Sequence, residues 1–281
     1  MTRLAEIEAH IVSMSELRDI VGAMRSLAGM RMQEAQRTLP GIRRYAESVA
    51  AGLADTLLLM AEPKPPHNIQ GRSALVLCTA EHGFVGGFNQ RLLETAQGLL
   101  GHGDLLFVLG TRGAALAFER GLPASWTYPM ATRCAAASET IQRLSTELYR
   151  RIAQGEVARV EVIYARYRQG GAARIERHLL LPLDMTSLGA KQPRQPPLHN
   201  MNPVSLHERL MAEYVFALLT EAVVESIASE NAARIAAMES AHDNVCSKLD
   251  TLHRDARQAR QFEITAEILE LVAATMALGG K

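Results

Sequence analysis

The chain has 281 residues, of which 48% are hydrophobic and 5% aromatic, and its 30 basic side chains balance 30 acidic ones. The apolar content excludes a wholly disordered chain, and the zero net charge gives no reason to expect a nucleic-acid partner. Three widely spaced cysteines form no CxxC pair and no apolar run reaches the roughly 20 residues that cross a bilayer, which argues against a disulfide framework, a structural metal site and direct lipid insertion.

Two proline-rich segments, residues 62–72 and 186–205, carry most of the prolines of the chain. Proline lacks the backbone N–H and keeps the preceding residue out of the helical region, so both segments are expected to be extended connections. They divide the chain into an N-terminal helical part (1–61), a central block (72–185) and a C-terminal helix (204–278).

The N-terminal part has apolar side chains at steps of three and four residues, which predicts a long amphipathic helix. After Met14 the pattern continues at Leu17 and then at Ile20 or its neighbour, a one-step slip that would change the supercoil locally. Because proline removes one helical hydrogen bond, we expect a kink or a short break at Pro40-Gly41. The apolar positions are Leu4, Ile7, Ile11, Met14, Leu17, Ile20, Val21, Met24, Leu27 and Ala28.

The central block alternates short apolar runs with amphipathic stretches, which is typical of an α/β fold with a mostly parallel sheet. Gln169-Gly170-Gly171 joins the last two runs and predicts a hairpin that adds an antiparallel edge. We therefore expect a central Rossmann-like α/β domain. The expected strands are 73–79, 104–109, 159–167 and 174–181, and the expected helices are 88–100, 112–120 and 138–153.

A glycine-rich turn with Gly83, Gly86, Gly87 and Asn89 follows the first expected strand and opens the first expected helix. Phosphate-binding loops occupy this place in many α/β folds. The turn matches neither GxxxxGK[ST] nor GxGxxG and lacks the Lys-Ser/Thr that would hold a magnesium nucleotide, so a structural turn is favoured over a ligand site. With no HExxH and no His/Cys cluster, the sequence predicts no cofactor, no metal site and no catalytic residue.

The C-terminal part runs from Val204 to Leu278 without glycine or proline, and as one helix it would be roughly 110 Å long. Part of it alternates steps of four and three residues, the a/d spacing of a coiled-coil seam, which must face a partner helix. We expect the two terminal helices to pair as a long antiparallel coiled coil, whose exposed apolar surface implies a sheath of other subunits. The seam positions are Met238, His242, Val245, Leu249, Leu252, Ala256 and Ala259.

Two groups of residues on these helices are candidates for partner contacts. Arginines recur every six or seven residues in the N-terminal helix, which fits either a solvated face or a basic stripe that meets acidic surfaces of a partner. In the C-terminal helix, Arg257, Arg260 and Gln261 could bond to carboxylates and carbonyls of a partner loop, and an apolar end suited to a hydrophobic socket follows. The arginines are Arg18, Arg25, Arg31, Arg37 and Arg44, and the apolar end comprises Ile264, Ile268, Leu271, Val272 and Met276.

Three motifs occur in the order found in one known family and together span nearly the whole chain. They are Ile20-Val21-Gly22-Ala23-Met24, Gly83-Phe84-Val85-Gly86-Gly87-Phe88-Asn89 and, after the run SENAARIAAMESAHDN, Arg260-Gln261-Phe262-Glu263-Ile264-Thr265-Ala266-Glu267. They resemble motifs of the gamma subunit of F-type ATP synthases, the central rotor shaft. This chain has Gly22 and Arg31 where that family has lysines, and Pro40-Gly41 where its helix is uninterrupted, which indicates a divergent branch.

The resemblance implies a non-catalytic rotor subunit that couples ion flow through a membrane sector to ATP synthesis or hydrolysis in a catalytic head. The implied partners are the alpha and beta subunits of the soluble head, the epsilon subunit and the membrane c-ring. The implied location is peripheral, at the cytoplasmic face of a bacterial inner membrane.

The resemblance also implies roles for individual residues. Arg260 and Gln261, with Arg257 and Thr265, would contact a loop of a catalytic subunit. The coupling region, which would face an acidic lever of the catalytic subunits, is implied to contain Met24, Arg25 and Arg31. The apolar bearing tip is implied to contain Ile268, Leu271, Val272 and Met276.

Two other functions stay open alongside this one. A coiled-coil scaffold with an unrelated α/β domain would explain the periodicity but not the ordered motifs. A nucleotide-using α/β enzyme with helical dimerisation arms would need a phosphate loop and acid/base residues, which the sequence does not show. Nucleotide binding by the isolated chain would favour the enzyme.

Overall fold

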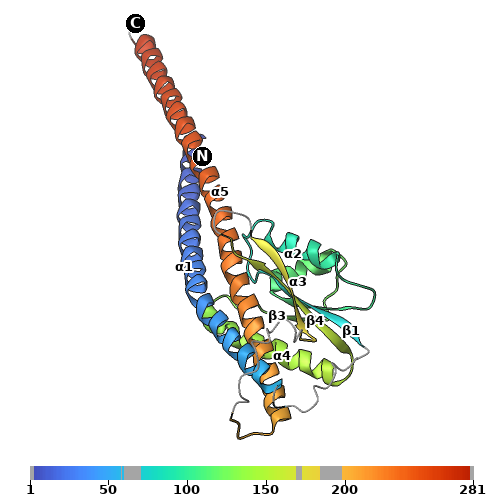
Figure 1. Ribbon diagram of the computed structural model, residues 1–281. Coiled ribbons are helices and arrows are strands. Elements are labelled where there is room, and N and C mark those ends of the chain that lie inside the picture. Colours follow the sequence, from blue (N-terminus) through green and yellow to red (C-terminus); the bar gives the residue numbers. More distant parts are fainter. Residues whose placement is uncertain (1–2, 58, 60–70, 169–172, 184–197, 279–281) are drawn as a thin grey trace. The chain divides into compact units, whose positions relative to one another are not determined.

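Figure 1 shows the computed structural model, which describes residues 3–57, 59, 71–168, 173–183 and 198–278. The chain forms two compact units. The helical unit comprises the described residues up to Leu27 and from Ile235 onward, and the mixed unit comprises those from Ala28 to Arg234. The division into three parts at the proline-rich segments stays a prediction, because most residues of those segments lie outside the described ranges.

Two long helices run through both units: α1 (Arg3–Leu57) and α5 (Pro203–Leu278). They pair antiparallel, since Arg260 of α5 bonds to Glu8 of α1 in the helical unit and Arg43 of α1 bonds to Glu221 of α5 in the mixed unit. The start of α5 is well capped, because Asn202 Oδ1 accepts a hydrogen bond from Val204 N at 2.9 Å and Pro203 occupies the first helical position.

The predicted seam of α5 is confirmed by burial. Met238, Val245, Leu249 and Leu252 are buried, and the other three seam positions, including His242, are half-buried. These side chains repeat at the heptad period, so the seam faces a partner helix through this part of the helical unit.

The slip expected in α1 near residue 17 is wrong. Leu17, Ile20 and Leu27 are 40%, 57% and 43% exposed, whereas Val21 and Ala28 are buried seven residues apart. The seam continues without a slip because a polar side chain occupies the position four residues after Met14: Arg18 is half-buried there and bonds to Ser15 Oγ and to Asp19. A pattern that counts apolar residues alone therefore passes through the exposed residues Leu17, Ile20 and Leu27 and misses the buried face of the helix. The buried side chains of α1 are Val21, Ala28, Ala35, Leu39, Ala46, Val49, Leu53 and Thr56.

Of the kink or short break expected at Pro40-Gly41, the break is wrong, because α1 is continuous from Arg3 to Leu57, and the kink stays a prediction. Pro40 and Gly41 are both exposed, so the ring and the missing side chain face solvent. Buried Leu39 and Ala46 keep packing in the core on the opposite side. Tertiary burial on both sides of Pro40 thus outweighs one lost backbone hydrogen bond.

The mixed unit contains a five-stranded sheet in the order β3-β2-β1-β4-β5. Pairing is parallel except between β4 and β5, as the sequence predicts. The glycine hairpin expected between these two strands lies outside the described residues. The strands are β1 (Arg72–Cys78), β2 (Leu105–Leu109), β3 (Trp126–Tyr128), β4 (Val157–Arg166) and β5 (Arg174–Leu181).

Strand β3 and a 3-10 turn at Cys134–Ala136 were not expected from the sequence. β3 has only three residues and is followed by Pro129, so it shows no run of alternating apolar residues. It extends the sheet edge through register with β2, and Trp126 stacks on Tyr128 with ring centroids 5.8 Å apart. Its pairing with β2, together with the contact between Phe107 and Trp126 at a ring-centroid distance of 5.9 Å, joins residues far apart in the chain, which a short sequence window does not show.

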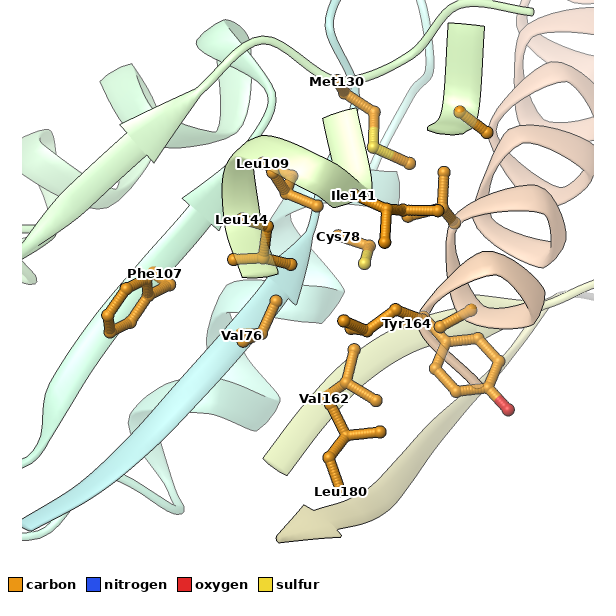
Figure 2. Packing of buried hydrophobic residues seen from close by; sticks show 14 of the residues in the cluster. Val76, Cys78, Phe107, Leu109, Met130, Ile141, Leu144, Val162, Tyr164 and Leu180 are labelled. Atoms are coloured by element: carbon orange, nitrogen blue, oxygen red, sulfur yellow. The ribbon is translucent and has the colours of Figure 1, made fainter. Parts of the chain in front are cut away.

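Helices cover both faces of the sheet. The helices α2 (Phe88–Gln97) and α3 (Thr111–Glu119) pack on one face, and α4 (Ala137–Ala153) packs on the other together with the α1–α5 pair of the mixed unit. Figure 2 shows Ile141 and Leu144 of α4 over Val76, Cys78 and Phe107 of the strands. These layers confirm an α/β fold with long terminal helices.

Candidate functional site

The candidate contact residues of the helical unit lie on one stretch of α5. Arg260 Nη2 donates to Glu8 Oε1 of α1 at 2.7 Å, and the two side chains are 63% and 49% exposed. Arg260 and Arg257 line a shallow groove together with Glu8 and His253. The guanidinium of Arg260 is thus held at the surface, where a carboxylate of a partner could reach it.

Two further candidates, Gln261 and Thr265, lie next to this groove on the same helix. Gln261 is exposed, which suits a contact with a partner. Thr265 Oγ1 donates to the backbone carbonyl of Gln261 at 2.8 Å. The hydroxyl hydrogen of Thr265 is therefore used within its own helix, which leaves the hydroxyl oxygen as an acceptor and the methyl group for a partner.

The apolar end of α5 is the most exposed apolar region of the helical unit that the structure describes. Because Glu8 lies opposite Arg260 in an antiparallel pair, Arg3 at the start of α1 lies opposite about residue 265. Beyond that level, the described part of α1 no longer accompanies α5. The side chain of Met276 lies outside the described residues. The exposed apolar side chains are Phe262, Ile264, Ile268, Leu269, Leu271 and Val272.

The three residues expected in the coupling region lie along α1. Met24 is half-buried and Arg25 is exposed, about 24 Å along the helix from Glu8. Arg31, in the mixed unit, is half-buried, and its Nε is buried without a hydrogen-bond partner among the described residues. Within the helical unit, Met24 and Arg25 therefore do not form one site with the Arg260 groove. Whether the arginines form a solvated face or a partner-binding stripe stays open; Arg25, Arg37 and Arg44 are exposed, and Arg18 and Arg31 are half-buried.

The glycine-rich turn is held by side chains of its own chain. Asn89 Oδ1 accepts a hydrogen bond from Ala80 N at 2.9 Å, and Gly83 O accepts one from Arg234 Nη2 at 3.3 Å. Gly86 adopts a positive φ of 53°, and Gly87 immediately precedes α2. Exposed Phe84 also has a positive φ, 61°, which is uncommon for a residue with a side chain. These contacts support the interpretation of a structural turn.

A buried ion pair secures that turn to α5. Arg234 Nη2 lies 2.6 Å from Glu230 Oε1, and both side chains are less than a tenth exposed. Burial raises the pKa of Glu230, whereas the charges of Arg234 and Arg31 act in the opposite direction. Glu230 and Arg234 are four residues apart on α5. The packing of α5 on the sheet therefore determines where this ion pair lies relative to the glycine-rich turn.

Helix α5 covers the edge of the sheet at which α/β folds commonly bind ligands. Ser226 Oγ donates to Cys78 O at the end of β1 at 3.0 Å, and Ser229 Oγ donates to Ala165 O in β4 at 2.8 Å. Ligands of open α/β sheets bind outside the carboxyl ends of the strands, and here a helix of the same chain occupies that place. Sequence reasoning missed both serines, because they are two of several polar residues in this stretch of α5 and carry no motif of their own.

The described residues at the strand ends also show no reactive group. Burial raises the pKa of the Cys78 thiol to about 12, so it is not a nucleophile at neutral pH. Among the described residues, no three histidine, cysteine, aspartate or glutamate side chains are grouped to hold a metal ion. None of the described helices combines the length and the apolar character needed to cross a membrane.

Comparison with known proteins identifies relatives along the entire chain. The ATP synthase family model matches residues 3–278. The ATP synthase gamma chain of Synechococcus elongatus is 30% identical over 100% of both chains, and that of Chlorobaculum tepidum is 27% identical over 99% of both.

Solved structures share the fold. A chain of the Euglena gracilis mitochondrial ATP synthase, in the OSCP/F1/c-ring structure, aligns with a TM-score of 0.67 at 14% identity and covers 98% of this chain and 94% of its own. A chain of the Tetrahymena thermophila central stalk/c-ring structure aligns with a TM-score of 0.55 at 19% identity, over 79% and 99%.

Proposed function

The chain belongs to the family of ATP synthase gamma chains, and on this premise we propose that it is the central rotor of an F-type ATP synthase. It couples ion flow through the membrane sector to ATP synthesis or hydrolysis in the head by turning inside it. The family model spans the α/β domain as well as both terminal helices, which removes the reason to treat that domain as unrelated to a coiled-coil scaffold.

The observation that carries the proposal is the exposed apolar end of α5. Residues 264–273 are all exposed, although the stretch contains Ile268, Leu269, Leu271 and Val272. Contiguous exposed apolar surface of this kind commonly marks a site where another protein binds. In a rotor this stripe would turn inside an apolar bearing formed by the head.

Rotation would act through differential contacts. The α1–α5 pair is asymmetric, so each angular position presents a different surface to each surrounding subunit and stabilises a different conformation of it. In this proposal Arg260 and Gln261, flanked by Arg257 and Thr265, contact a loop of a catalytic subunit. Met24, Arg25 and Arg31 face the acidic lever of the catalytic subunits in the same proposal, and Ile268, Leu271, Val272 and Met276 form the bearing tip.

Partners and location follow from the same proposal. The helices would turn within the alpha and beta subunits, where catalysis resides, and the α/β domain would bind the epsilon subunit and the c-ring. The chain would be a peripheral subunit at the cytoplasmic face of a bacterial membrane. Helix α5 occupies the ligand-binding edge of the sheet, which favours a domain that binds proteins over one that binds a nucleotide.

Co-expression with the alpha and beta subunits of the same genome tests the proposal. We expect a stable complex whose steady ATP hydrolysis requires this chain. A matched complex in which α5 ends after Arg260 separates assembly from the contribution of the apolar end. Absence of any association, with the purified chain monodisperse on its own, would contradict the rotor function.

A further inference from the structure

Four charged side chains from three elements meet where β4 ends. Arg43 of α1 donates from Nε to Glu221 Oε1 at 2.8 Å and from Nη2 to Glu225 Oε1. Arg166 of β4 donates to the same two oxygens, from Nη2 to Glu221 at 3.4 Å and from Nε to Glu225 at 3.3 Å. Each carboxylate of α5 therefore bridges one arginine of α1 and one arginine of the sheet. We call Arg43, Arg166, Glu221 and Glu225 the charge joint.

Burial makes the charge joint more than a surface ion pair. The side chain of Glu225 is 3% exposed and that of Glu221 is 17% exposed, whereas the two arginines are about two-fifths exposed. The second oxygen of Glu225 accepts a hydrogen bond from the backbone N–H of Tyr167 at 3.3 Å. A buried carboxylate without its partners is strongly unfavourable, so Glu225 keeps α1 and the end of β4 next to α5.

The hydrogen bonds of the charge joint depend on direction, whereas the apolar packing around them does not. Apolar contacts between α5 and the sheet oppose separation through non-directional burial, whereas the hydrogen bonds of the charge joint add a resistance that depends on the rotation angle of α5. A guanidinium binds two carboxylates through N–H groups with fixed geometry, so a small rotation of α5 breaks several bonds together. Bonding to Glu221 raises the pKa of Arg43, because a neighbouring carboxylate stabilises the charged guanidinium.

We propose that the charge joint is the point at which turning force passes between the α/β domain and the helix pair of the mixed unit. This inference rests on the proposed rotor function and adds positioning residues to it. Arg166 resists rotation of α5 against the sheet, and Arg43 makes α1 turn together with α5. Without the joint the domain stays packed on α5 through the apolar core and the Ser226 and Ser229 bonds, but it resists rotation under load less strongly.

The test uses the complete complex in membrane vesicles whose catalytic head faces outward. ATP hydrolysis and ion uptake are measured in the same vesicles, with proton and sodium uptake both recorded. For Arg166→Gln we expect hydrolysis within about twofold of the parent and a fall of at least about threefold in ions moved per ATP, because hydrogen bonds to charged groups are among the stronger ones. A merely stabilising contact would lower the melting temperature without changing this ratio.

Controls and a double variant sharpen the result. Arg209→Gln removes an exposed arginine of α5 outside the charge joint and is expected to leave the ratio unchanged. Arg166→Lys keeps the charge but loses the planar fork, and an intermediate ratio is expected. Because both arginines act through the same two carboxylates, the loss in the Arg43→Gln and Arg166→Gln double variant should be smaller than the two single losses combined.

Two outcomes would overturn the joint. One is a parental ion-to-ATP ratio in assembled Arg166→Gln; the other is fully additive losses in the double variant. If Arg166→Gln does not assemble, the same ratio is measured in Arg43→Lys and Arg166→Lys, and parental values in both would also overturn it. The rotor function fails separately, namely if the parent complex hydrolyses ATP equally well without this chain.

Discussion

Two stretches of α5 of equal length have opposite surroundings. Residues 222–231, in the mixed unit, are all buried, whereas residues 264–273, in the helical unit, are all exposed. The exposed stretch, ITAEILELVA, is the more apolar of the two: each contains two glutamates, but AVVESIASEN also contains two serines and an asparagine. Apolar content alone therefore does not tell which part of a helix its own chain covers.

The polar residues distinguish the two stretches. In the buried one, Glu225, Ser226 and Ser229 each bond to the sheet or its neighbouring backbone. Buried polar groups need partners in known positions, and these partners are supplied within the chain. The exposed stretch offers apolar side chains with little demand for bonding geometry, which suits a surface that moves against its partner.

The largest expected effect comes from placing one charge in each stretch. Val223→Asp puts a carboxylate at a fully buried position and should lower the free energy of unfolding by about 3–5 kcal/mol. Ile268→Asp changes an exposed side chain and should stay within about 0.5 kcal/mol. Urea unfolding of the purified chain, followed by circular dichroism, measures both. Equal losses would mean that the end of α5 is covered by its own chain.

Truncating the groove residues should affect the assembled complex and not the fold. Arg260→Ala removes a charge-assisted contact worth about 1.5–3 kcal/mol, so coupled ATP synthesis should fall several-fold. Gln261→Ala removes a neutral contact worth about 1 kcal/mol, so the fall should be smaller. The melting temperature of each purified variant should match the parent. Lys248→Ala, at an exposed position of the same helix, is the control. Normal coupled activity in both groove variants would rule out their assigned role.

A charge introduced on α1 sharpens the contrast between contact and core. Met24 is half-buried, so Met24→Lys should cost about 1 kcal/mol or less in chain stability because the long side chain can reach solvent. In the complex it adds a charge beside the proposed coupling region and should lower ion transport per ATP while assembly remains intact. Unchanged transport per ATP would count against a coupling role for this part of α1.

The smallest effect is expected at the surface ion pair of the groove. Glu8→Gln removes the partner that holds Arg260, and because both side chains are about half exposed the stability should change by less than about 0.5 kcal/mol. The freed guanidinium should engage a partner carboxylate slightly more readily, which a double variant with Arg260→Ala would abolish. Comparing coupled activity in Glu8→Gln, Arg260→Ala and the double variant measures this. A gain that persists without Arg260 would show that Glu8 acts in another way.

The elements that repeat over many residues could be predicted from the sequence. The α5 seam from Met238 to Leu252 and the strands β1, β2, β4 and β5 all have periodic patterns long enough to outweigh local exceptions. Features that depend on one residue could not. Arg18 keeps the α1 seam in register although it is polar, and Pro40 sits in a continuous helix because it faces solvent.

The candidate site was predictable to a different degree. Arg260 and Gln261 could be named because their motif resembles a known family, and the structure adds Glu8 as the partner of Arg260. The charge joint escaped sequence analysis because Arg43 and Glu221 are separated by 178 residues. A pairing over that distance becomes visible only when the helices are placed, since many arginines and glutamates lie on the same faces.

The bonds from Ser226 and Ser229 to the strand ends determine how α5 is positioned on the α/β domain. A heptad seam by itself is nearly degenerate, because sliding one helix by seven residues, about 10 Å, returns similar side chains to the interface. A slide of α5 along the sheet by this distance would leave the two hydroxyls and the carbonyls of Cys78 and Ala165 without these bonds in the core. The two serines therefore fix one rotation angle and one axial position of α5 relative to the α/β domain.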